Sequence, residues 1–118
     1  MKSLKINFDT LDGYYNLIVL DNHTYSIETN IESLDSKSGI IDCYDRFIKE
    51  LSDVNIQAWD KNYDSSKLNI EDAVKWKVEL DDYSSNGIEG NWPYTYDKLI
   101  DVIKLIDSKA DYFKANVA

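Results

Sequence analysis

The chain has 118 residues, with 13 Lys or Arg against 22 Asp or Glu, so its formal net charge is −9. Hydrophobic residues make up 43% of it, which is enough to form a core without disulfides or a metal. The excess of acids argues against direct binding to nucleic acid or to an anionic membrane. Arg46 is the only arginine, which excludes a phosphate clamp of several guanidinium groups. The charge favours attraction to a basic partner instead.

A single cysteine, Cys43, cannot form an internal disulfide and is typical of a reducing compartment. The start of the chain holds no apolar stretch like that of a signal peptide, and no run approaches the roughly 18 apolar residues of a membrane span. The abundance of Ile, Asn, Lys, Asp and Tyr is typical of an AT-rich bacterial or phage genome. We therefore expect a single domain over residues 1–118, located in the bacterial cytosol or in the cytosol of a phage-infected cell.

The first thirty residues alternate in a way that predicts strands. Residues 4–9 switch between apolar and polar side chains with a period of two, the pattern of a half-buried strand. Asp12-Gly13 is a strong hairpin signal. Residues 14–20 are apolar on both faces, which predicts a central strand covered on both sides. Residues 25–31 alternate again, so this part predicts an antiparallel meander.

After a polar, turn-rich segment at 32–39, the period changes. From Ile40 to Val54, apolar residues recur at spacings of three and four, which predicts a helix capped by Ser36 or Ser38. The following segments are predicted as a short strand at 56–59, a polar loop at 60–72, a strand at 74–80, a turn at 82–87 and a short return strand at 88–89.

A second helix is predicted after Gly90, with Pro93 in its first turn. Its buried stripe comprises Tyr96, Leu99, Ile100, Ile103, Ile106, Ala110 and Phe113. The predicted order is β-β-β-α-β-β-β-α. This order indicates an α+β fold, with an antiparallel sheet of about five or six strands and two helices packed on one face.

His23 is the candidate general base of the chain and Cys43 the candidate nucleophile, and neither has a suitable setting. His23 lies in a predicted tight turn, where a general base rarely finds a cleft, so we interpret it as a solvated turn residue. Cys43 has Asp42 and Asp45 nearby, which disfavour a thiolate, so we interpret it as a small, semi-buried hydrophobe. Without a second histidine, a His-based metal site is excluded.

The acidic loop at 60–71 matches the calcium-binding loop of an EF-hand in part. Oxygen-bearing residues stand at its first, third, fifth and twelfth positions, namely Asp60, Asn62, Asp64 and Glu71. Ser65 stands where the sharp turn needs glycine, and the flanking elements are predicted strands. We therefore favour a solvated loop and predict no metal, no cofactor, no catalytic residues and no enzyme. A small metal-binding or enzymatic domain that uses this loop is the alternative.

Aromatic residues are concentrated in the second half of the chain. Trp76 falls on the inward side of its predicted strand and is assigned to the core. Tyr and Trp are common anchors of protein interfaces, and here acids flank them. The predicted partner-binding residues are Asp81, Asp82, Tyr83, Glu89, Trp92 and Tyr94. For Trp92 and Tyr94, a staple that packs the helix entry onto the sheet is an equally favoured interpretation.

Three segments between residues 76 and 106 carry a resemblance. They are the amphipathic strand Trp76-Lys77-Val78-Glu79-Leu80, the break Gly90-Asn91-Trp92-Pro93 and the helical Tyr96-Asp97-Lys98-Leu99-Ile100. This arrangement resembles small, acidic, uncharacterised proteins of low-GC Gram-positive bacteria and their phages, a resemblance that implies no activity. In size and charge the chain is also similar to anti-CRISPR and immunity proteins.

These observations lead to one functional hypothesis and two alternatives. We expect a protein-binding inhibitor of a basic partner, such as a nuclease or another nucleic-acid-binding enzyme. Its carboxylates would stand where phosphates bind, and its charge would steer the encounter. One alternative is the metal-binding or enzymatic domain already described. The other is an accessory subunit whose partner the sequence does not identify.

Overall fold

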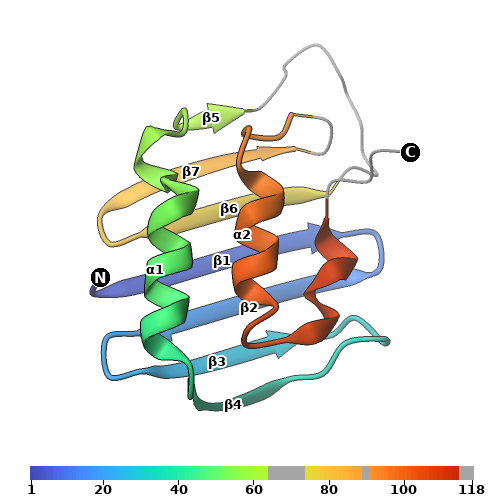
Figure 1. Ribbon diagram of the computed structural model, residues 1–118. Helices are drawn as coiled ribbons and strands as arrows, with labels where there is room; N and C mark the ends of the chain where they lie inside the picture. Colours follow the sequence, from blue (N-terminus) through green and yellow to red (C-terminus); the bar gives the residue numbers. More distant parts are fainter. Residues whose placement is uncertain (64–73, 89–90, 115–118) are drawn as a thin grey trace.

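The computed structural model describes residues 1–63, 74–88 and 91–114. Its centre is a seven-stranded sheet with the order β4-β3-β2-β1-β6-β7-β5 (Figure 1). The strands are β1 (Ser3–Thr10), β2 (Gly13–Leu20), β3 (Thr24–Thr29), β4 (Lys37–Ile40), β5 (Asn62–Tyr63), β6 (Lys75–Leu80) and β7 (Tyr83–Ile88). Neighbouring strands run antiparallel, except that β5 pairs with β7 in parallel. The fold is therefore mixed, and its sheet is larger than the five or six strands predicted.

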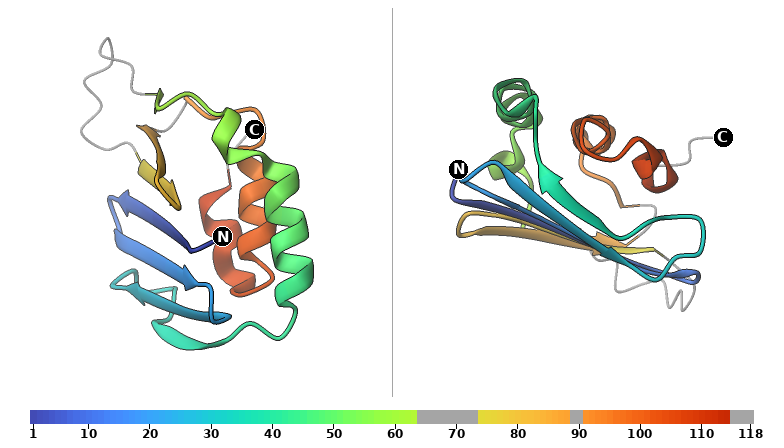
Figure 2. Two further views of the ribbon diagram at one scale, coloured as in Figure 1. Left: turned by 90° about the vertical axis from the view of Figure 1, so that its left-hand side faces the viewer. Right: turned by 90° about the horizontal axis from the view of Figure 1, so that it is seen from below.

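Both helices lie on the same face of the sheet, as Figure 2 shows. The helical elements are α1 (Tyr44–Val54), α2 (Tyr96–Ile103) and the 3-10 segments η1 (Ile56–Ala58) and η2 (Ser108–Phe113). On the opposite face, which we call the open face, no helix of the described residues covers the strands. Within the same residues, no helix has the length and apolar character needed to cross a membrane.

β1 is the strand on which the two halves of the sheet meet. It pairs with β2 on one side and with β6 on the other, and Ile6 stands in register with both Leu17 and Val78. Its inward side chains Leu4, Ile6 and Phe8 are at most 1% exposed. The hairpin predicted at Asp12-Gly13 is confirmed by the pairing of β1 with β2. The alternation in the first strand therefore marks the centre of the core.

The second strand was predicted to be covered on both sides, and this was wrong. The inward side chains of β2 are buried, but Ile18 is 38% exposed and Leu20 is 42% exposed on the open face. The two apolar residues suggested a second layer because a strand at the centre of a sheet is often buried twice. Here the sheet has one face against helices, and no helix of the described residues covers β2 on the other face.

The segment predicted as polar and turn-rich at 32–39 overlaps the edge strand β4, which continues to Ile40. Its outward residues are small or exposed, and Ile40 pairs with Thr24 instead of starting a helix. Helix α1 begins at Tyr44 with Cys43 at its N-cap position, so capping by Ser36 or Ser38 was wrong. An edge strand needs no apolar alternation, and the spacing of Ile40 from the helical stripe is coincidental.

The predicted strand at 56–59 is a 3-10 turn instead. Asn55 adopts a left-handed conformation with φ of 55° and ends α1. The N–H groups of Ala58 and Trp59 then donate to the carbonyls of Asn55 and Ile56. The short apolar run that suggested a strand therefore forms a 3-10 turn directly after α1, and this turn buries Ile56.

The predicted turn at 82–87 is mostly strand β7, because the turn is confined to Asp81 and Asp82. The small residues that suggested a turn make room for Trp76 instead. A Cβ atom on Gly87 would lie 2.7 Å from the Trp76 ring, closer than such atoms approach one another. Glycine here allows a fully buried tryptophan to pack against its neighbouring strand.

The second predicted helix is divided into α2 and η2, and Pro93 precedes it. The buried stripe is confirmed from Tyr96 to Phe113, except that Ile106 is only half-buried. The predicted helix is interrupted at Asp107, whose side chain accepts a hydrogen bond from the N–H of Lys109 and caps the start of η2. The carboxylate of Asp107 is buried and also accepts a 2.9 Å hydrogen bond from the Tyr15 hydroxyl. Burial, followed by the charge of Asp107, raises the pKa of Tyr15.

Asp81 closes the β6–β7 turn and holds the start of the chain against it. Its backbone is left-handed, with φ of 55°, and its carboxylate accepts hydrogen bonds from the N–H groups of Lys2 at 2.6 Å and Ser3 at 3.1 Å. Chiefly because of the Lys2 N–H, the pKa of Asp81 lies below its ordinary value. Asp82, the next residue, is exposed.

We predict that Asp81→Asn lowers the free energy of unfolding by about 1 kcal/mol at neutral pH, since it weakens two charge-assisted hydrogen bonds. A lowered folded-state pKa stabilises the fold above the ordinary pKa, and this stabilisation is lost as the pH falls through the lowered value. The difference from the wild type should therefore shrink in urea titrations below about pH 4. Asp82→Asn is the control and should leave stability within about 0.5 kcal/mol. Equal effects of the two changes would contradict this role of Asp81.

Candidate functional site: the open face and an acidic corner

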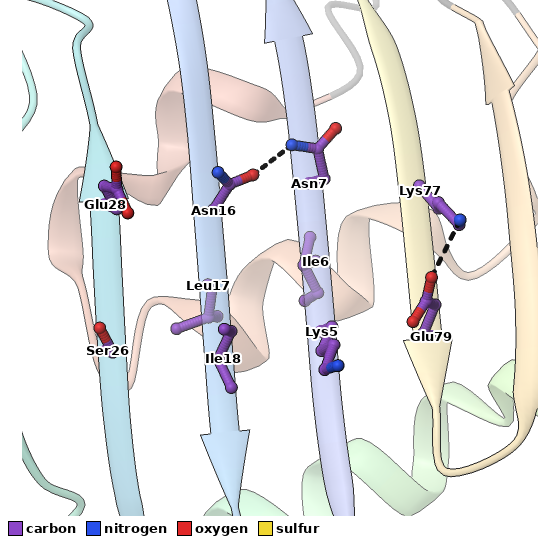
Figure 3. Close-up of a pocket in the computed structure, with 10 residues that line it drawn as sticks. All are labelled: Lys5, Ile6, Asn7, Asn16, Leu17, Ile18, Ser26, Glu28, Lys77 and Glu79. Carbon is purple, nitrogen blue, oxygen red and sulfur yellow. Dashed lines mark hydrogen bonds and ion pairs between the residues drawn. The ribbon is translucent and has the colours of Figure 1, made fainter.

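The open face holds a shallow depression at its centre (Figure 3). It has a volume of about 270 Å³ and is formed by outward side chains of β1, β2, β3 and β6. The amide of Asn7 donates to that of Asn16 across β1 and β2, and the Lys77 ammonium lies 2.9 Å from the Glu79 carboxylate. The depression is open, its exposed lining is more apolar than polar, and Ile18 is its exposed apolar side chain.

The open face carries no net charge. Its outward charged residues on the described strands are Lys5, Lys75 and Lys77 against Asp9, Glu28 and Glu79. The negative charge of the chain is therefore concentrated elsewhere, at the strand ends, in the loops and on the helices. A row of carboxylates that imitates a phosphate backbone is absent from the described part of this face.

An acidic corner lies where the β2–β3 turn meets the start of α1. The ring of Tyr44 stacks on that of His23 with centroids 3.7 Å apart and planes 10° apart. The N–H of Ile41 donates to the carbonyl of His23, which joins the two segments. Three exposed acids flank the stacked pair, and we call these five residues the acidic corner: Asp21, His23, Asp42, Tyr44 and Asp45.

The surroundings of Tyr44 in the acidic corner change the pKa of its hydroxyl. Burial, followed by the charges of Asp21 and Asp45, raises the pKa of its hydroxyl. Among the described residues, no Lys or Arg forms an ion pair with Asp21, Asp42 or Asp45. The corner thus combines a half-buried aromatic ring with unpaired negative charge.

The partner-binding residues predicted from the sequence do not form one surface. Asp81, Asp82 and Tyr83 lie at one end of β7, whereas Trp92 and Tyr94 follow its other end. Six residues of strand separate these ends by about 20 Å. Glu89 lies outside the described residues.

Within the predicted set, several side chains have structural partners. The Tyr83 hydroxyl donates to the carbonyl of Trp59, and Asp81 holds the N-terminal strand. The ring centroids of Trp92 and Tyr96 lie 4.2 Å apart, and both rings also pack near the ring of Trp76. These contacts are those of a staple over the helix entry. Tyr94, in contrast, is fully exposed.

Asp82 is the predicted residue that the fold brings towards the acidic corner. Leu20, at the end of β2, pairs with Ser3, and the N–H of Asp81 donates to the Ser3 carbonyl at 2.9 Å. The β2–β3 and β6–β7 turns therefore lie at the same end of the sheet, with their centres three strand spacings, or about 14 Å, apart. The sequence did not reveal the corner, because Asp21 and Asp45 are far apart along the chain and are brought together by tertiary contacts, namely the pairing of β4 with β3 and the contacts of His23 with Ile41 and Tyr44.

The other candidates of the sequence have ordinary surroundings. His23 is exposed in its turn, with a left-handed φ of 69°, and Cys43 is half-buried before α1. Of the calcium-like loop, Asp60 and Asn62 are described, whereas Asp64 and Glu71 lie outside the described residues. Over the described ranges, no group of three His, Cys, Asp or Glu side chains is arranged to hold a metal ion.

We predict that Trp92→Ala lowers the free energy of unfolding by about 2 kcal/mol or more, because it removes the ring that packs on Tyr96 and Trp76. Thermal denaturation followed by circular dichroism measures this loss. Tyr94→Ala is the matched control and should leave the melting temperature unchanged. If Trp92→Ala is as stable as the wild type, the staple interpretation is wrong.

Comparison of the chain with protein-family models, with curated proteins and with solved structures gave no match. The resemblance carried by residues 76–106 therefore stays a prediction. A function for the chain has to be argued from the geometry and charge of its own surface.

Proposed function

We propose that the chain is a protein-binding inhibitor that recognises a basic, nucleic-acid-handling protein through the acidic corner. The observation that carries this proposal is the stacked His23–Tyr44 pair, surrounded by the exposed carboxylates of Asp21, Asp42 and Asp45, which form no ion pair with the described part of the chain. Aromatic anchors surrounded by charge are typical of protein interfaces.

The charges of the corner favour a basic partner over other ligands. Carboxylates that have no internal ion pair attract lysine and arginine side chains, and they raise the rate of encounter with a positive surface. The net charge of −9 acts in the same direction over longer distances. A nucleic-acid-binding enzyme offers such a positive surface at its phosphate sites, so carboxylates bound there would block its substrate.

The contacts that join the two segments of the corner support a preformed surface. Its acids lie on two segments that the sheet and α1 hold together, and Asp has a short side chain that loses little freedom on binding. Asp82 extends the negative charge along the same end of the sheet. The corner therefore needs little rearrangement to meet a partner.

The test compares partner binding by variants of equal net charge. Protein from cells that naturally produce the chain is captured on wild-type bait, identified by mass spectrometry, purified and titrated by calorimetry. We predict that the double variant Asp21→Lys/Asp45→Lys weakens binding by at least about tenfold, since it places positive charge at the contact. Tyr44→Ala should also weaken binding, by about 2 kcal/mol, if the ring is an anchor.

The control is Glu32→Lys/Asp53→Lys, which changes the net charge equally at exposed positions outside the corner. It should reduce binding far less, and all variants should keep the circular dichroism spectrum of the wild type. Equal loss in both double variants would show that net charge alone matters. Capture of an acidic partner, or unchanged affinity in the corner variants, would contradict the proposal.

A further inference from the structure

The open face has a pattern of charge that is complementary to itself. In one row across the sheet, Glu28, Asn16, Asn7 and Lys77 follow one another on β3, β2, β1 and β6, each in register with the next. Figure 3 shows these four side chains side by side. Glu28 and Lys77 thus lie at equal distances, about 7 Å, on either side of the line midway between β1 and β2.

We propose that two copies of the chain associate face to face through the open face, about a two-fold axis that lies midway between β1 and β2 and runs nearly parallel to them. This rotation places Glu28 of each copy opposite Lys77 of the other, so that two ion pairs form in which Lys77 exchanges or shares its contact with Glu79 of its own chain. Asn7 and Asn16 of each copy meet Asn16 and Asn7 of the second. An axis along the strands also produces the aligned packing that twisted sheets prefer.

The neighbouring row is compatible with the same axis. Ser26, Ile18, Lys5 and Glu79 are in register on the same four strands. The rotation sets Ile18 against the methylene stem of Lys5 and sets the Ser26 hydroxyl against the Glu79 carboxylate. Burial of Ile18, which is 38% exposed in one copy, then provides an apolar contact at the centre.

The charges of the open face select a second copy over a basic partner. On the described strands, β1 and β6 carry three outward lysines against Asp9 and Glu79, which leaves this half with a net charge of +1. β2, β3 and β4 carry Glu28 as their outward charge on that face. The two halves have opposite sign, and a second copy presents the matching half to each of them at once.

The area of the face is sufficient for a specific dimer. Six of the seven strands face a counterpart across this axis, since β5 has none. At about 4.8 Å spacing and about six residues of length, they cover on the order of 600 Å² on each copy. The pair would bury about 1,200 Å² in total, at the lower limit of specific interfaces. The contact is mostly polar, so we expect a reversible dimer whose population depends on concentration.

The first experiment is sedimentation equilibrium of the full chain over a range of concentrations up to about 1 mM. The apparent mass should rise from that of the 13.7 kDa monomer towards twice that value. Glu28→Lys and Lys77→Glu, each alone, should weaken self-association by about tenfold or more, because each variant sets like charges against each other. A mass that stays monomeric at every concentration would overturn the proposal.

The decisive experiment mixes the two variants. Across the proposed axis, the Glu28→Lys protein and the Lys77→Glu protein present only opposite charges to each other, so their mixture should form a heterodimer. The double variant Glu28→Lys/Lys77→Glu should regain self-association for the same reason. Lys49→Glu, an exposed reversal on α1, is the control and should leave the dimer unchanged. If the wild type forms a dimer and both single variants associate as tightly as it does, the copies do not meet through this face. The same conclusion follows if the mixture of the two variants fails to associate.

This inference is independent of the proposed function. The acidic corner lies at the strand ends and the charged rows lie across the centre of the sheet, so the variants of one leave the other intact. Loss of partner binding with a normal dimer, or the reverse, tells which of the two proposals fails.

Discussion

The structure depends on the burial of one side of the central strand β1. Leu4, Ile6 and Phe8 are almost completely removed from solvent, and the register of β1 with both β2 and β6 follows from keeping them inward. A slip by one residue would turn all three to the open face, at a cost of several kcal/mol in lost apolar burial. The two halves of the sheet and both helices are arranged around this strand.

Because the core lies on one side, the outward side chains are free to serve recognition. The helices complete the core through a stripe that continues from α2 to η2, and Trp76, Trp92 and Tyr96 close it at one end. The open face is left polar and without net charge, while unpaired acids gather at the corner between the β2–β3 turn and α1. One sheet thus carries two surfaces of different chemistry, for which we propose a second copy and a basic protein as the partners.

The periodicity of the sequence was sufficient to predict the elements that bury apolar residues. The β1–β2 hairpin, β6, the stripe of α1 and the stripe of α2 and η2 all have strong patterns, and all are present. The edge strand β4 and the strand β7 were missed, because an edge needs no alternation and β7 uses Ser85 and Gly87 to accommodate Trp76. The corner and the row from Glu28 to Lys77 depend on strand order, which periodicity does not reveal.

The central claim is that the open face and the acidic corner are separate binding surfaces on one rigid sheet. Nuclear magnetic resonance on the isotope-labelled chain tests it directly, by following backbone amides during dilution and during titration with the captured partner. The account predicts that dilution shifts the outward residues of β1, β2, β3 and β6, and that the partner shifts residues 21–24 and 42–45. Shifts confined to the exposed sides of α1 and α2, or the same residues responding in both titrations, would contradict it.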